Sequence, residues 1–193
     1  MRMVLGLLGA AVWIGASAGS AAAFTASYDQ KITQGRNVYQ SNVQMKDGFF
    51  RMEMTIGGEF SVIIRNADGV YTVMPGQGMA MKTPYLQLGQ EPVQGASDYA
   101  EYLRQHNAER LGAETIDGRA CEIYRFIDPE LGGSITAWVW TEKMFPIRFE
   151  ADAPGGKTLT ELSNVELGAA IPEDAFQLPA GIELMDMGAM MGW

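Results

Sequence analysis

Hydrophobic and polar residues alternate along most of the chain after residue 23, and short turn sequences interrupt the alternation. In the stretch 24–82 the interruptions include the pairs Asp47-Gly48 and Asp68-Gly69. A period of two places successive side chains on opposite faces of a β-strand, and Asp-Gly pairs suit hairpin turns with positive φ. The pattern therefore predicts a meander of antiparallel strands over this stretch.

The second half of the chain predicts a helix and further strands. Proline and glycine mark residues 83–96 as a loop, and a short helix with Ser97 as its N-cap is expected at 97–106. Its apolar residues recur at spacings of three and four, which gives it one stripe to bury. Alternation then predicts a second series of strands over 110–167, followed by a helical turn at 171–176.

Together these segments amount to about ten strands and one or two short helices. Sheets of about ten twisted antiparallel strands tend to curl on themselves. The sequence thus predicts a mainly β fold, in which a curved antiparallel sheet forms an incomplete β-barrel closed by the short helices. We expect this domain to cover residues 24–182, and residues 183–193 to form a methionine-rich tail.

The N-terminal residues have the layout of an export signal. Arg2 supplies a positive charge, an apolar run follows, and small residues at 20–23 suit a signal peptidase. Residues 1–23 are therefore expected to be a signal peptide that is cleaved near Ala23, which leaves an exported, acidic protein. The alternative is an uncleaved membrane anchor, because the charge-free stretch is long enough to span a bilayer.

Charge and cysteine content exclude several classes of function. The formal net charge is −9, and nucleic-acid binding needs a basic stripe that this chain lacks. The same charge disfavours a clamp on anionic lipid headgroups. A single cysteine forms neither an internal disulfide nor a multi-thiolate metal site, and no motif for a cofactor is present.

No set of residues supports catalysis. The only histidine, His106, is expected to be an exposed residue at the end of the predicted helix, where an imidazole can meet the last carbonyls. Cys121 is expected to be a buried apolar residue on a strand, although a nucleophilic pair with His106 is an alternative. The carboxylates are scattered and no hydrolase or phosphate-binding motif occurs. We therefore expect a protein that is not an enzyme.

Methionine is abundant, with 13 residues, and many of them lie on the first strand series. They are either ordinary core residues or the lining of a cavity that accepts guests of variable shape, such as acyl chains. On the cavity hypothesis the lining would be formed by large apolar side chains of both strand series. The candidates are Phe50, Met52, Met54, Ile56, Phe60, Val62, Ile64, Met74, Trp138 and Trp140.

The tail after residue 183 carries a Met-x-Met pair and a Met-Met pair. Thioethers are soft ligands suited to Cu(I), so a copper site is one hypothesis for this tail. A frayed end is another, and a segment that folds back over a hydrophobic opening is a third.

Three segments together resemble one family: the strand–turn–strand 44–54, the hairpin 67–71, and the ending Ile171-Pro172-x-x-x-Phe176-x-Leu178-Pro179-x-Gly181. In order and spacing they are similar to the LolA-like outer-membrane lipoprotein-sorting superfamily, more closely to its periplasmic DUF4412-type branch. The resemblance covers nearly all of residues 24–181. It implies an incomplete barrel around a hydrophobic cavity, and a place in the periplasm.

The resemblance also implies a role and one contact. Sorting chaperones of this superfamily carry lipoprotein acyl chains, and a basic residue before the equivalent turn holds their helical lid closed. Lys46 has the matching place here, and lysine lacks the planar fork of arginine. The leading hypothesis is thus an exported, non-enzymatic binder or carrier of lipid or lipoprotein acyl chains. The alternative is a module with a filled core that binds an envelope protein partner or senses envelope stress.

Overall fold

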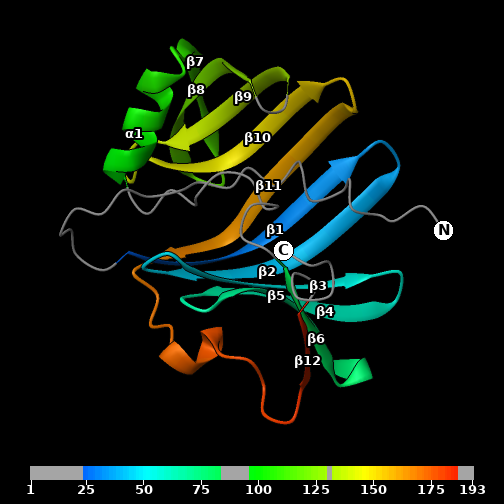
Figure 1. Ribbon diagram of the computed structural model, residues 1–193. Helices are drawn as coiled ribbons and strands as arrows, with labels where there is room; N and C mark the ends of the chain where they lie inside the picture. Colours follow the sequence, from blue (N-terminus) through cyan, green and yellow to red (C-terminus); the bar gives the residue numbers. More distant parts are fainter. Residues whose placement is uncertain (1–23, 84–95, 130–131, 187–193) are drawn as a thin grey trace. The chain divides into compact units, whose positions relative to one another are not determined.

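A computed structural model describes residues 24–83, 96–129 and 132–186 of the chain. These residues form twelve strands, one α-helix and two 3₁₀ turns (Figure 1). The first strands are β1 (Thr25–Gln34), β2 (Asn37–Lys46), β3 (Phe49–Ile56), β4 (Glu59–Asn66), β5 (Gly69–Met74) and β6 (Met79–Thr83). The later ones are β7 (Glu109–Ile116), β8 (Arg119–Asp128), β9 (Gly133–Trp140), β10 (Phe145–Ala153), β11 (Gly156–Leu167) and β12 (Glu183–Asp186).

The strands belong to one sheet in the order β12-β6-β5-β4-β3-β2-β1-β11-β10-β9-β8-β7. Most neighbours are consecutive in sequence and antiparallel, whereas β12 pairs in parallel with β6. The helix is α1 (Ala96–Gln105), and the 3₁₀ turns are η2 (Pro75–Gln77) and η4 (Glu173–Phe176). The predicted mainly β fold with an antiparallel sheet and a short helix is confirmed.

Differences from the predicted elements are small. The described sheet has twelve strands rather than about ten, and β12 lies at the start of the predicted methionine-rich tail. A four-residue parallel strand carries too little alternation to be recognised from sequence. The helix begins at Ala96, so Ser97 lies in its first turn and is not the N-cap. Of the predicted loop at 83–96, residues 84–95 lie outside the described residues.

Two compact units share the chain. The first contains Lys31–Val38 and the described residues of Gln90–Ser163, and the second contains the described residues of Ser20–Gln30, Tyr39–Gly89 and Asn164–Trp193. A single domain over 24–182 stays a prediction. None of the described helices is long and apolar enough to cross a membrane.

In the first unit, α1 packs on the sheet. Tyr99 and Leu103, one turn apart on the helix, are both buried. They contact an apolar patch contributed by β8, β9 and β10, which consists of Phe126, Ile135, Ala137, Val139, Phe149 and Ala151. The stripe predicted from the helical spacing is the one that the structure buries.

In the second unit, the chain after β11 covers one face of the sheet. We call residues 169–182 the C-terminal segment. Its Leu178 and Ile182 pack on a buried cluster from β4, β5 and β6, made of Val62, Ile64, Tyr71, Val73 and Ala80. Phe176 in η4 is also buried, with its ring centroid 5.8 Å from that of Phe49.

Candidate functional site

The predicted cavity-lining residues of the first strand series lie on two faces of the sheet. Met52 is paired with Ile63, whereas Ile64 is paired with Arg51, so the side chains of Met52 and Ile64 point to opposite sides. The face of Met52 carries Phe50, Met54 and Met74, and the face of Ile64 carries Phe60 and Val62. Ile56 ends β3, and its side chain lies outside the described residues.

The second face is occupied by protein. Val62 and Ile64 are buried beneath the C-terminal segment, and Phe60 at the start of β4 is 47% exposed. On the first face Phe50 and Met52 are buried, whereas Met54 and Met74 are half-buried. The structure therefore does not bring this set together around a single cavity. The sequence does not reveal this, because turn pairs locate the strands but do not show which strand faces lie on the same side of the sheet.

The two predicted tryptophans lie against charged groups. Trp138 donates a hydrogen bond from Nε1 to Oε2 of Glu114 at 2.7 Å, and the Arg148 guanidinium lies 5.4 Å from its ring centroid. Trp140 has the guanidinium of Arg119 and the ammonium of Lys143 at 5.2 and 5.9 Å from its ring centroid. These are cation–π arrangements, and they differ from the apolar environment that a hydrocarbon guest requires.

Lys46 contacts the chain near η4. Its Nζ donates a hydrogen bond to the backbone oxygen of Ile171 at 3.4 Å and lies 3.6 Å from Oε1 of Glu173. The family resemblance implies a lid contact for this lysine, and the segment that it contacts covers a sheet face. Asp47 follows it in the predicted turn, with φ of 48°.

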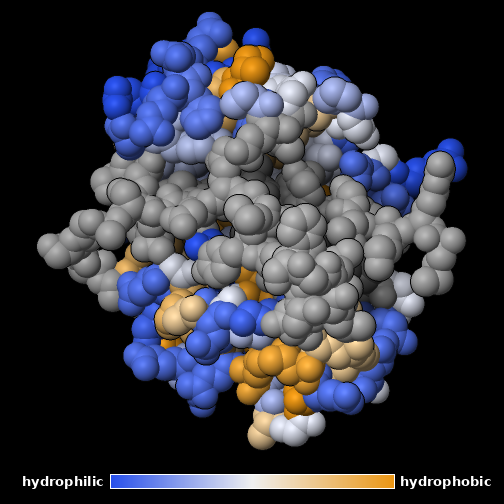
Figure 2. Space-filling view, in the orientation of Figure 1, coloured by the Kyte–Doolittle hydropathy of each residue, from blue (hydrophilic) through white to orange (hydrophobic). Residues whose placement is uncertain are grey.

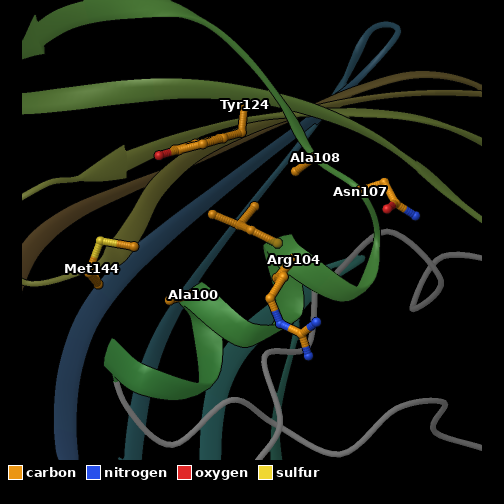
Figure 3. A pocket seen from close by; sticks show the side chains of 7 residues that line it. Ala100, Arg104, Asn107, Ala108, Tyr124 and Met144 are labelled. Carbon is orange, nitrogen blue, oxygen red and sulfur yellow. The ribbon is translucent and has the colours of Figure 1, made fainter.

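A pocket of about 390 Å³ lies between α1 and the sheet of the first unit (Figure 3). Tyr124 from β8 and Met144 from the turn before β10 line it opposite the helix, whereas Arg104 points away from the sheet. The complete lining is Ala100, Leu103, Arg104, Asn107, Ala108, Tyr124 and Met144. Its volume falls within the range of small-molecule sites.

The ionisable groups at this pocket are already paired. Arg104 donates from Nε to Oε2 of Glu101 at 2.7 Å, and this bond, followed by one from Gln105, lowers the pKa of Glu101 to about 2. The hydroxyl of Tyr124 donates to Oε2 of Glu122 at 2.5 Å. Burial and this bond raise the pKa of Tyr124, and the bond lowers the pKa of Glu122. The pocket thus combines an apolar wall with a neutralised polar rim.

Met144 has a backbone conformation that methionine rarely adopts. Its φ is 47°, in the left-handed region. The other described non-glycine residues with positive φ are aspartates or asparagines, which tolerate this region because their short polar side chains bond locally. A methionine here stores strain, and stored strain is a recognised feature of functional sites. The sequence signal, one methionine in a turn, is too short to single it out.

His106 and Cys121 do not form a catalytic pair. The His106 ring is half-buried, with Nδ1 2.9 Å from the backbone oxygen of Tyr102 and the ring beside Tyr102 and Phe126. The expected contact with a late helix carbonyl is confirmed, although the residue is less exposed than expected. Cys121 is buried, and burial raises the pKa of its thiol. Cys121 is five positions before Phe126 on β8, so its side chain points to the opposite face of the sheet from Phe126, beside which the His106 ring lies.

Groups of three or more His, Cys, Asp or Glu that could hold a metal ion do not occur among the described residues. The predicted copper site uses the methionines of the tail, of which Met187, Met190 and Met191 lie outside the described residues and Met185 lies in β12.

Comparison with known proteins gives structural matches only. No family model matches the sequence, and neither does any curated protein. The structure is similar to that of an uncharacterized conserved protein from Thermus thermophilus, with a TM-score of 0.56 and 12% identity, over 85% of this chain and 90% of that chain.

A second match is to the structure of the Pseudomonas aeruginosa MucA/MucB complex, with a TM-score of 0.54 and 13% identity. It covers 84% of this chain, which spans 58% of the matched chain. A LolA superfamily protein from Nitrosomonas europaea, NE2245, matches at a TM-score of 0.38 and 12% identity, over 81% of this chain and 90% of that chain. A TM-score this low does not show a shared fold. The first two matches show a shared fold, and the DUF4412-type branch stays a prediction.

Proposed function

We propose that this protein is an exported, non-enzymatic binder of lipid or lipoprotein acyl chains that acts in the periplasm. The observation that carries the proposal is the pocket beneath α1, with a wall of Leu103, Ala100, Ala108 and Met144. An acyl chain needs an apolar wall and no unpaired charge, and the charged groups at this rim are paired, Arg104 with Glu101 and Glu122 with Arg110.

The strength of binding follows from the burial of methylenes. Each buried methylene contributes about 0.8 kcal/mol, so about ten give roughly 8 kcal/mol before the costs of immobilisation. The net affinity is then expected to be micromolar or weaker. Such an affinity suits a carrier, which has to release its cargo.

The strained Met144 supports the same site. A left-handed conformation costs an ordinary residue roughly 1–2 kcal/mol compared with glycine. The chain keeps a long, adaptable thioether at this point of the pocket wall. Methionine adapts to guests of variable shape, which is the property that a site for acyl chains needs.

The test fills the pocket by a substitution at an exposed residue, so that the buried core is left unchanged. Ala100 lines the pocket from an exposed position on α1, so we expect Ala100→Trp to obstruct it. Gln105→Trp is the matched control, on the same helix but outside the lining. Binding of a dansyl-labelled undecanoic acid is followed by fluorescence, with lauric acid as the competitor. We expect a loss of at least tenfold in affinity for Ala100→Trp and less than twofold for Gln105→Trp.

The proposal fails if the unmodified protein leaves the probe fluorescence unchanged and native mass spectrometry finds no co-purifying lipid. It also fails if both tryptophan variants bind as the unmodified protein does.

A second candidate is a module that binds an envelope protein partner. It is favoured by the fold shared with a structure that contains a MucA/MucB complex. At 13% identity this likeness concerns the fold, so a partner for this chain rests on analogy. Cross-linking in the envelope tests this candidate. A partner protein that is recovered equally well with the unmodified protein and with Ala100→Trp would favour it over acyl binding.

A further inference from the structure

Four methionines share one face of three neighbouring strands in the second unit. Met74 on β5 is paired with Met79 on β6, and Met81 on β6 is paired with Met185 on β12. Met79 and Met81 are two positions apart on one strand, so they point to the same side. We call Met74, Met79, Met81 and Met185 the methionine cluster.

The sheet geometry brings these side chains within reach of one another. Residues directly opposite on neighbouring strands have Cβ atoms about 4.5–5.5 Å apart, and positions i and i+2 on one strand are about 7 Å apart. The cluster therefore occupies a patch that spans three residues along β6 and is three strands wide. Unbranched methionine side chains are long enough for the sulfur atoms of three adjacent members, such as Met79, Met81 and Met185, to converge.

These methionines are not closed into the core. Each of the four is half-buried, whereas Met45 and Met52 on β2 and β3 are 6% and 2% exposed. Figure 2 shows hydrophobic residues gathered at the surface in the region where Figure 1 draws β6 and β12. Ordinary core packing accounts for Met45 and Met52, whereas each methionine of the cluster keeps part of its surface accessible.

The position of Met185 depends on a specific backbone bond. The N–H of Glu183 donates to the backbone oxygen of Gly78 at 2.9 Å, just after the η2 turn, where Gly78 has φ of 66°. This bond fixes the register in which β12 pairs with β6 and so sets Met185 beside Met81. Glu183 itself is paired with Met79, which places a carboxylate at the edge of the cluster.

We propose that the methionine cluster binds a soft monovalent cation, Cu(I) or Ag(I). Neutral thioethers are soft donors that suit such ions, whereas Zn²⁺ is bound by thiolate, imidazole or carboxylate and Mg²⁺ by oxygen ligands. The acidic protein, with net charge −9, attracts a cation to this surface. Because Met79 and Met81 lie on β6 and Met185 lies on β12, the bound ion joins the short edge strand β12 to its neighbour.

The experiment titrates the purified full chain with silver nitrate, a redox-inert probe, by calorimetry and native mass spectrometry. We expect one Ag⁺ per chain. The variant Met79→Leu/Met81→Leu should bind at least tenfold more weakly, while Met52→Leu, at a buried position on β3, changes the affinity less than twofold. Leucine conserves volume, and equal melting temperatures in the absence of silver show that the variants fold.

Two further measurements locate the site. Silver should slow amide exchange in β12, since the ion bridges this strand to β6. A chain that ends at Asp186 removes the remaining methionines of the tail, Met187, Met190 and Met191, and should keep the affinity within threefold. The proposal is overturned if the full chain does not bind Ag⁺, if the double variant binds less than tenfold more weakly, if truncation abolishes binding, or if Zn²⁺ binds as tightly as Ag⁺.

Discussion

Arg51 on β3 donates a hydrogen bond from Nη1 to the backbone oxygen of Ala175 in η4, at 3.0 Å. Asn66 at the end of β4 makes the equivalent bond to the next residue, from Nδ2 to the backbone oxygen of Phe176 at 2.9 Å. A single 3₁₀ turn leaves most of its carbonyls without helical partners. Side chains of the sheet satisfy them here, and this holds the C-terminal segment on its face.

Replacing Arg51 by methionine tests this attachment. Arg51→Met keeps much of the apolar stem but removes the charged donor, so we expect a loss of about 1.5–3 kcal/mol in the free energy of unfolding. Urea denaturation measures the loss, and hydrogen exchange should show faster opening at residues 169–182. Arg125→Met, at an exposed position on β8, is the control and should change the stability by less than about 0.5 kcal/mol.

Gly133 at the start of β9 lies so close to β10 that a side chain does not fit. A Cβ there would come within 2.3 Å of the backbone oxygen of Asp152 and within 2.8 Å of the Cα of Ala153. Because backbone atoms cannot move aside cheaply, Gly133→Ala should destabilise the protein by about 3 kcal/mol or more. The matched change Gly155→Ala, where a Cβ would meet nothing within 4 Å, should stay within about 1 kcal/mol. Equal urea midpoints for the two variants would contradict the close approach.

The sequence predicts the strands better than it predicts their faces. Each hairpin turn carries its own local signal, and the predicted turn pairs Asp47-Gly48 and Asp68-Gly69 lie where β2 gives way to β3 and β4 to β5. Whether Met52 or Ile64 faces a cavity depends on what packs on each side, and no local pattern contains that information. For the same reason the predicted cavity residues separate onto two faces, while the pocket beneath α1 has no signal in the sequence.

Some side-chain roles are accessible from sequence because they follow from local spacing. Tyr99 and Leu103 are expected to bury one stripe of a helix, and they do. Lys46 is connected with a lid only through family resemblance, and its contact with Ile171 spans 125 residues of sequence. A contact across such a separation depends on the topology of the sheet, which propensities do not determine.

Tyr99 carries a buried hydroxyl that, among the described residues, has no hydrogen-bond partner. An unsatisfied buried donor costs roughly 1–3 kcal/mol, so Tyr99→Phe should raise the free energy of unfolding by about 1 kcal/mol. Tyr124→Phe should have the opposite sign, since it removes the bond to Glu122. Urea denaturation of both variants checks the signs. A clear loss of stability in Tyr99→Phe would show that the hydroxyl has a partner such as an ordered water.

Glu101 links the stability of α1 to pH. Its pKa is lowered to about 2 by hydrogen bonds from Arg104 and then Gln105. A carboxylate whose pKa is lowered on folding stabilises the folded state above its ordinary pKa, near 4.3, and this contribution is lost as the pH falls toward 2. Carbon NMR of the Glu101 carboxyl should give a midpoint near 2, and Arg104→Gln should move it up toward 4.3. A midpoint near 4.3 in the unmodified protein would contradict the pairing.

Met144 offers a test in which stability and ligand binding separate. Met144→Gly relieves the left-handed strain but removes apolar contact with the core beneath α1, so the two effects offset each other. We expect the free energy of unfolding to change by less than about 1 kcal/mol, while the affinity for the dansyl-labelled acyl probe falls at least fivefold because the pocket loses part of its wall. Met144→Leu keeps both the strain and the wall and should bind within twofold. If the glycine variant binds as tightly as the unmodified protein, Met144 does not contact the ligand, and the strain in this turn requires another explanation.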